Sequence, residues 1–207
     1  MSSLNPNIAA KFKIQFKEHC IALLLEGYES LKDEKGVREL SENNITARLM
    51  GFIDKNPKRK TFQISVIREA YLDTEEIYEG EVDADKSHRI DMKYITWNGS
   101  EEYTFHLECK NLAENNWTKS TSAEVDANAL RRRYISTGIQ NFVSGRYPLG
   151  CLVGYVLEGK TAKIVEKVNA LLSSDGRKSE NLKSKTSTVY SSTHSPLVLE
   201  HYFLTFQ

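Results

Sequence analysis

The segment from Arg89 to Leu112 is the part of the chain that most constrains its fold. Two runs rich in β-branched and aromatic residues flank Asn98-Gly99, a dipeptide that readily adopts the positive φ angles of a tight hairpin turn. If these two residues form the loop, apolar pairs share one face of the hairpin: Tyr94 with Tyr103, Met92 with Phe105 and Ile90 with Leu107. Apolar pairs on one face are typical of two antiparallel strands that contribute to a core.

The other face of this hairpin is charged. It carries Arg89, Asp91 and Lys93 on the first strand and His106, Glu108 and Lys110 on the second. In the predicted register Asp91 lies opposite His106 and diagonal to Glu108, and diagonal neighbours are roughly 7–8 Å apart. Side chains at that spacing can converge on one ion, so the sequence predicts a cation site.

The donors available at this site suit magnesium. Mg²⁺ typically takes one or two carboxylates and keeps several waters. Asp91 and Glu108 supply the carboxylates, and the carbonyl of Cys109 is a further oxygen. Mn²⁺ is expected to substitute. Lys110 points the same way as Glu108, where it can orient an attacking water or neutralise charge on a phosphate.

A polar strand face also has an ordinary explanation. It is commonly a solvated surface, and a Glu-Lys pair on such a surface contributes little stability. Phe105, Leu107 and Leu112 make this strand apolar enough to be central, however, so its polar face should be covered. Buried carboxylates need a partner or a metal.

Asp91, followed sixteen residues later by Glu108-Cys109-Lys110, resembles the motif of the PD-(D/E)xK nuclease superfamily, the fold of many restriction endonucleases. Ile90 stands where that motif has proline. The resemblance covers about residues 41–157. It implies a restriction-endonuclease-like α/β fold, with a central mixed β-sheet flanked by helices, and a Mg²⁺-dependent nuclease that acts on DNA.

The resemblance also implies roles for two helices. In the superfamily an acidic residue from a helix ahead of the sheet often approaches the metal, and Glu42 matches it; the alternative is an acid favoured by the helix dipole. The helix after Glu-x-Lys commonly supplies a further polar residue. Gln140 is the candidate, with Arg133 as an alternative that would contact phosphate.

Charge does not by itself indicate a nucleic-acid partner, because 28 basic residues balance 28 acidic ones. Basic clusters nevertheless occur at residues 55–60, 131–133 and 177–185, and local patches can attract a polyanion. The candidate contacts are Arg132, Arg133, Lys58 and Trp117, each of which is alternatively a solvated or loop-packing side chain.

Hydrophobic periodicity predicts the remaining elements. Helices are expected at 8–32, from 41 onward, at 124–144 and at 161–172, and strands at 62–67, 149–157 and 197–206. The basic run near Pro57, the segments 173–188 and 193–195 and the acidic segment 71–86 are expected to be loops or an insertion. We expect an N-terminal helix at 1–40 packed on a nuclease domain at 41–207, in one compact unit.

Several protein classes are disfavoured. No apolar run approaches the roughly 20 residues that span a bilayer, and no signal peptide is visible, so we expect no membrane association. Cys20, Cys109 and Cys151 are far apart in apolar sequence, which is typical of a reduced, cytoplasmic protein. A Ser-His-Asp hydrolase is disfavoured because the sequence has no nucleophile elbow.

Three hypotheses remain for the function, and the third is a structural protein whose polar strand face is an ion-pair network. The first is a nuclease that hydrolyses phosphodiester bonds, where a homodimer would suit cutting both strands of a duplex, by analogy with the fold. The second is an inactive member of the same fold that binds nucleic acid or a protein complex. The complete set of Asp91, Glu108 and Lys110 favours the enzyme.

Overall fold

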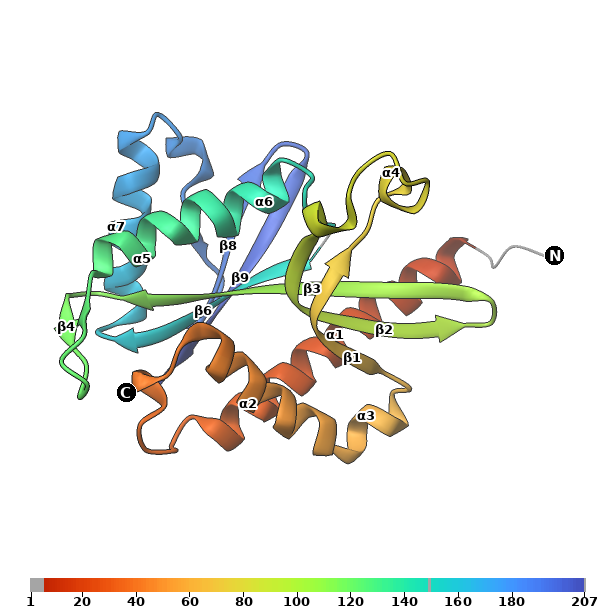
Figure 1. Ribbon diagram of the computed structural model, residues 1–207, viewed down its shortest axis with the longest axis horizontal. Helices are drawn as coiled ribbons and strands as arrows, with labels where there is room; N and C mark the ends of the chain where they lie inside the picture. Colours follow the sequence, from red (N-terminus) through yellow and green to blue (C-terminus); the bar gives the residue numbers. More distant parts are fainter. Residues whose placement is uncertain (1–5, 149, 207) are drawn as a thin grey trace.

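Strand β3 (Glu101–Ala113) is the element around which the other elements are arranged. Its side chains from Phe105 to Lys110 are all buried, because strands flank it and helices cover both faces of the sheet (Figure 1). The computed structural model describes residues 6–148 and 150–206. Within them the fold is α/β, a mixed sheet flanked by helices, which confirms the fold class at this level.

The main sheet has seven strands in the order β1-β2-β3-β6-β9-β8-β7. The middle strands β3, β6 and β9 are parallel, and the pairs on either side are antiparallel. Parallel neighbours require crossover connections, and helical segments lie in both of them. The other bounds are β1 (Ser65–Leu72), β2 (His88–Asn98), β6 (Gly150–Glu158), β7 (Lys183–Ser184), β8 (Val189–His194) and β9 (Leu197–Thr205); β4 (Trp117–Thr118) and β5 (Glu124–Val125) form a separate ribbon.

Helices α1 (Pro6–Leu31) and α2 (Glu42–Lys55) cover one face of this sheet. The other face is covered by α7 (Thr161–Ser174) and by a long helical segment made of α5 (Ala127–Arg133), the π-helix η3 (Tyr134–Ile139) and α6 (Gln140–Val143). Figure 1 shows this segment crossing the sheet. Capping side chains mark where α2 and α5 begin. Ser41 Oγ accepts a hydrogen bond from Asn44 N at 3.3 Å at the start of α2, and Asp126 caps the start of α5.

Two groups of buried apolar side chains form the core, one on each face. On β3, Tyr103, Phe105, Leu107 and Cys109 pack towards α1 and α2, whereas Leu112 packs towards α5, α6 and α7. Alternation along the strand therefore directs the buried His106, Glu108 and Lys110 towards the α5–α6 side. Helix α1 packs on α2 and β3.

The register of the predicted hairpin is wrong by two residues. The turn lies at Gly99-Ser100, with Asn98 paired to Glu101, so Met92 faces Leu107 and Tyr94 faces Phe105. Gly99 has a φ of 64° and stands first in the loop, where a type II′ turn requires glycine. An even shift leaves each side chain on its predicted face.

Other differences are local. The basic run expected as a loop forms α3 (Pro57–Thr61), because Asn56 caps it and Pro57 occupies its first turn; β1 therefore starts at Ser65 and extends to Leu72. The acidic insertion contains α4 (Glu75–Tyr78) and η2 (Ala84–Lys86). Four further elements lie in segments where the sequence predicted either a loop or no element: η1 (Val37–Glu39), η4 (Lys178–Glu180), β7 and β8. Leu149, the predicted start of a strand, lies outside the described residues.

Every helix among the described residues is too short or too polar to serve as a membrane-spanning segment.

Candidate active site

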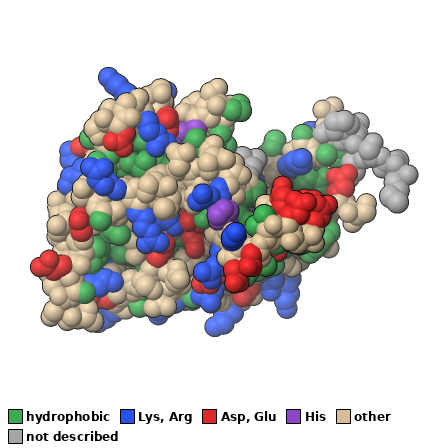
Figure 2. Space-filling model, turned by 45° about the horizontal axis from the view of Figure 1, so that its top comes forward, with side chains coloured by type: hydrophobic (Ala, Val, Ile, Leu, Met, Phe, Trp, Pro, Cys, Tyr) green, Lys and Arg blue, Asp and Glu red, His purple; other side chains and the backbone are tan. Residues whose placement is uncertain are grey.

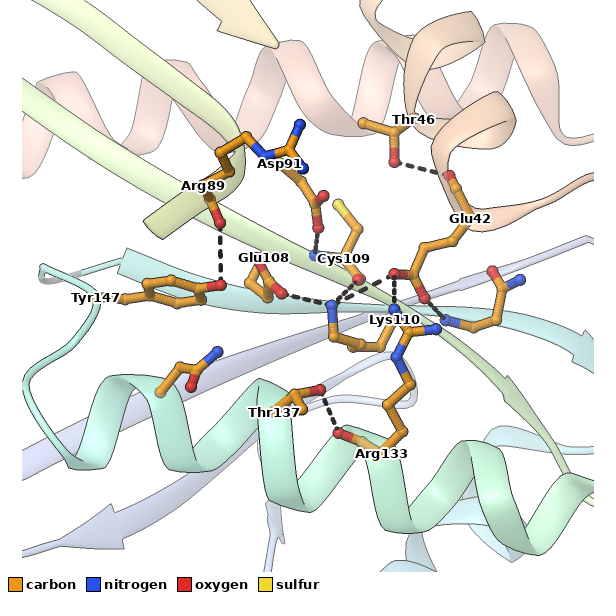
Figure 3. A network of polar contacts seen from close by, with 12 residues as sticks. Glu42, Thr46, Arg89, Asp91, Glu108, Cys109, Lys110, Arg133, Thr137 and Tyr147 are labelled. Carbon is orange, nitrogen blue, oxygen red and sulfur yellow. Dashed lines mark hydrogen bonds and ion pairs between the residues drawn. The ribbon is translucent and has the colours of Figure 1, made fainter. Parts of the chain in front are cut away.

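The site forms where β2 separates from β3. The antiparallel pairing of these strands ends at Met92 and Leu107, which leaves the following edge of β3 open. Carboxylates satisfy two N–H groups on that edge: Cys109 N donates to Asp91 Oδ2 at 2.6 Å, and Asn111 N donates to Glu42 Oε2 at 2.9 Å (Figure 3). Buried N–H groups require acceptors, so this open edge places two carboxylates beside each other.

Asp91 reaches β3 because β2 changes face at this residue. Met92 packs in the core on the α1–α2 side, whereas Ile90 packs in the core on the other side, so the two-residue alternation is broken between them. The neighbouring strand β1 is irregular at the same level: Glu69, which lies between the residues paired with Met92 and Ile90, has a φ of 50°. This left-handed conformation is uncommon for a residue other than glycine. The Asp91 carboxylate consequently lies at the edge of β3.

The ammonium group of Lys110 joins the carboxylates. Its Nζ donates to Glu108 Oε1, to Glu42 Oε1 at 3.3 Å and to the carbonyl of Cys109 at 2.9 Å. Figure 3 shows Glu42, Asp91, Glu108 and Lys110 converging from α2, β2 and β3. Lys110 and Glu108 are each only 4% exposed, and Glu42 is 8% exposed. The structure thus brings together Asp91, Glu108, Lys110, Glu42 and Cys109, all of which the sequence predicted for this site.

The cluster contains more acidic than basic side chains. Three carboxylates surround one buried ammonium, and the exposed Arg133 adds a guanidinium that contacts Glu42 Oε1 at 3.2 Å. Burial, with repulsion from Asp91, raises the pKa of Glu108 to about 8. Burial also raises the pKa of Asp91, whose carboxyl group shares a hydrogen bond with Glu108. Burial opposes the charge of Lys110, but attraction by the three carboxylates outweighs it and raises the lysine pKa.

The α5–α6 segment forms one wall of the site. Gly138 lets this segment approach β6, because a Cβ there would lie 3.1 Å from Leu152 Cδ2, and it stands next to Lys110, whose Cγ would be 3.6 Å from the same Cβ. The π-helix η3 has a wider turn than an α-helix, which shifts the phase of the following residues. Asn141 is consequently buried, whereas Gln140 is exposed.

Asn141 and Tyr147 were not predicted from the sequence. Tyr147 is 9% exposed, and its hydroxyl donates a hydrogen bond to the carbonyl of Arg89 at 3.0 Å. The side chain of Asn141 forms a second hydrogen bond with this hydroxyl. Glu108 and burial both raise the Tyr147 pKa, burial more strongly. Neither residue belongs to a sequence motif, and only the phase shift caused by η3 brings Asn141 inward.

Four predicted contacts lie away from this cluster. Gln140 and Arg132 line a depression on the outer side of the α5–α6 segment, beside Leu171 and Arg177. Lys58 pairs with Glu26 at 2.5 Å. Trp117 lies in the β4–β5 ribbon and packs against the core, which agrees with the loop-packing alternative.

Acidic side chains gather on one lobe of the surface, over the connection from β1 to β2 (Figure 2). Seven of them are exposed: Asp73, Glu75, Glu76, Glu79, Glu81, Asp83 and Asp85. A polyanion is disfavoured over this lobe. Arg133, 56% exposed at its side chain, offers positive charge at the mouth of the site instead.

The donor set can be compared with what a divalent ion needs. Within the described residues, no group of three or more His, Cys, Asp and Glu side chains is arranged to hold a metal ion. Mg²⁺, however, commonly takes only one or two carboxylates and completes its shell with water. Asp91 and Glu108 provide two adjacent carboxyl groups. These residues fit a magnesium ion held by Asp91, Glu108 and the Cys109 carbonyl.

Glu42→Gln is expected to lower the free energy of unfolding by about 1–3 kcal/mol, because it weakens hydrogen bonds to a charged partner in a buried cluster. Urea unfolding measures this change. Glu26→Gln is the control, since Glu26 pairs with Lys58 on the surface and exposed pairs contribute little. Equal effects of the two substitutions would contradict the buried network.

No protein-family model matches this chain, and the searches of curated proteins and of solved structures found no match either.

Proposed function

We propose that this protein is a metal-dependent phosphodiesterase with a restriction-endonuclease-like fold, a nuclease whose substrate is DNA. The observation that carries the proposal is the pair of adjacent carboxyl groups of Asp91 and Glu108, with the ammonium of Lys110 bonded to Glu108. A solvated polar strand would not bury these groups, since burial of unpaired charge is costly. The proposed nuclease superfamily would account for all three residues at once.

Each residue has a chemical task in this proposal. Cys109 N holds one oxygen of Asp91 and so orients this carboxyl group beside that of Glu108. Glu42 accepts from both Lys110 and Asn111 N, so it keeps the lysine beside Glu108. The protonated Lys110 can orient an attacking water and stabilise negative charge that develops on a phosphate.

A divalent ion bound by Asp91, Glu108 and the Cys109 carbonyl would neutralise charge on the scissile phosphate and lower the pKa of water. Arg133 is exposed and is therefore the residue placed to hold a neighbouring phosphate oxygen. Net neutrality of the chain is compatible with this arrangement, because phosphate attraction depends on local rather than total charge.

Incubation of supercoiled plasmid with the protein and Mg²⁺ or Mn²⁺ tests the proposal. We expect nicking or linearisation that requires the metal and disappears in Asp91→Asn. Asp54→Asn is the control, because Asp54 is exposed on α2 and contacts Arg59 at 3.7 Å. Absence of cleavage by the wild type, together with a melting temperature that ignores both metals, would favour the inactive binding subunit instead.

A further inference from the structure

A second cluster of titratable side chains lies outside the candidate active site, on the same face of the sheet. Glu180 Oε2 contacts His194 Nδ1 at 2.6 Å, and His194 Nε2 contacts Ser192 Oγ at 2.7 Å. Ser192 Oγ also contacts His201 Nε2 at 2.8 Å, and His201 Nδ1 contacts the Tyr134 hydroxyl at 2.8 Å. Five side chains from η4, β8, β9 and η3 therefore form one continuous chain of hydrogen bonds.

The first three members resemble an acid-histidine-serine triad, but this arrangement is not suited to nucleophilic catalysis. Ser192 is 1% exposed and is held between two imidazoles. His201 and Tyr134 are fully buried. A substrate cannot reach the serine hydroxyl in this structure, so the chain of bonds calls for another explanation.

Glu180 determines which atom donates in every bond. Arg177 binds its carboxylate through two nitrogens, at 2.6 and 3.0 Å, and this lowers the Glu180 pKa. An ionised carboxylate only accepts, so His194 must donate from Nδ1 and, as a neutral imidazole, accept at Nε2. Ser192 then donates to His194.

The same reasoning fixes the other half of the chain. Ser192 has one hydroxyl proton, so it must accept from His201 Nε2–H. His201 Nδ1 is then an acceptor, and Tyr134 donates to it. All four bonds run in one direction, from Tyr134 to Glu180, and the two histidines are different tautomers.

We propose that Glu180, His194, Ser192, His201 and Tyr134 form a hydrogen-bond relay with a single proton order, and that this relay positions the helical wall of the candidate active site. Tyr134 is the first residue of η3 and directly follows Arg133, which contacts Glu42. Four residues later, Gly138 packs against Lys110. The relay thus attaches the β8–β9 hairpin to the turn of helix that lies over the cluster.

The charged or titratable groups that act on the relay from neighbouring elements are Arg177 beside Glu180, Glu200 on β9 and the buried thiol of Cys151 on β6. Glu200 is paired with Lys17 and Lys185, each at 2.8 Å. Burial is the main cause that lowers the pKa of both histidines, which keeps them neutral as the relay requires.

Nitrogen-15 spectra of the histidine side chains test the proton order. We expect the Nδ1–H tautomer for His194 and the Nε2–H tautomer for His201. In Glu180→Gln the amide can donate as well as accept, so the reverse order becomes possible and a second set of tautomers should appear. Glu166→Gln is the matched control, because Glu166 forms a similar surface pair with Lys163. Identical tautomers in the wild type, or unchanged tautomers in Glu180→Gln, would overturn the proposal.

Amide hydrogen exchange tests the positioning role. Tyr134→Phe removes one hydroxyl and keeps the ring, and we expect exchange in residues 133–139 to become at least tenfold faster. Tyr190→Phe, a change in the same core outside the relay, should leave it unchanged. Equal exchange in wild type and Tyr134→Phe would refute positioning.

The expected effect on catalysis rests on the proposed function. If the protein cleaves DNA, Tyr134→Phe should lower kcat and leave KM nearly unchanged. If the wild type does not cleave DNA, the nuclease proposal fails, but the relay is still tested by the spectra and by hydrogen exchange.

Discussion

Lys110→Met is expected to reduce metal-dependent DNA cleavage about a hundredfold to a thousandfold, the cost typical of removing one charge-stabilising donor from an active site. Lys110 Nζ contacts Glu108, Glu42 and the Cys109 carbonyl, so its loss removes the buried positive charge of the cluster. Methionine keeps the aliphatic chain that packs beside Gly138. Rates of plasmid nicking, measured at saturating metal, give the result.

The fold should survive this substitution. Removal of a buried partner usually leaves an uncompensated charge, but Glu108, with a pKa raised to about 8, is mostly protonated near neutral pH and so leaves little charge unpaired when the ammonium is gone. Circular dichroism should therefore match the wild type. Lys93→Met is the control, since Lys93 lies on β2 and approaches Glu102 only to 3.8 Å. Cleavage by Lys110→Met at the wild-type rate would remove Lys110 from the proposed mechanism.

The residues of the candidate site were predictable because side-chain alternation survives errors in register. The predicted turn was misplaced, yet the even shift kept Glu108 and Lys110 on one face of β3. Asp91 reaches the site for a different reason from the one predicted: β2 changes face there and its carboxylate takes a backbone N–H. No pattern in the sequence predicts this change of face in β2.

The helical wall shows what periodicity cannot supply. The resemblance implied that this helix supplies Gln140 to the site, with Arg133 as the alternative. The π-helix η3 shifts the phase of the helix, and Asn141 is buried instead. Likewise β8 was missed because Thr193 and His194 are polar, although His194 is buried through its bonds to Glu180 and Ser192.

Acidification is expected to destabilise the protein through His201. Burial lowers the pKa of His201 to about 3, whereas an unfolded histidine has a pKa near 6.5. Above pH 6.5 both states are neutral and the residue contributes no pH dependence. Below it the unfolded state binds a proton that the folded state excludes, so the contribution of His201 to the free energy of unfolding falls by about 2 kcal/mol between pH 7.5 and 5. Glu108, whose pKa is raised to about 8, acts in the opposite direction over this range, so the effect of His201 is read from its substitution.

Urea unfolding of the wild type and of His201→Gln at these two pH values isolates this contribution: the pH 7.5-to-5 change in the free energy of unfolding should be about 2 kcal/mol more favourable in His201→Gln, because glutamine cannot take up the proton. His19→Gln, a change on α1 outside the relay, should keep the wild-type difference. Glu200 cannot account for the effect: its pKa is lowered to about 2, so its stabilisation is lost only as pH falls below about 4.5. The lowered pKa of His194 acts in the same direction as that of His201. An unchanged pH dependence in His201→Gln would therefore contradict the neutral, buried state on which the order of the relay depends.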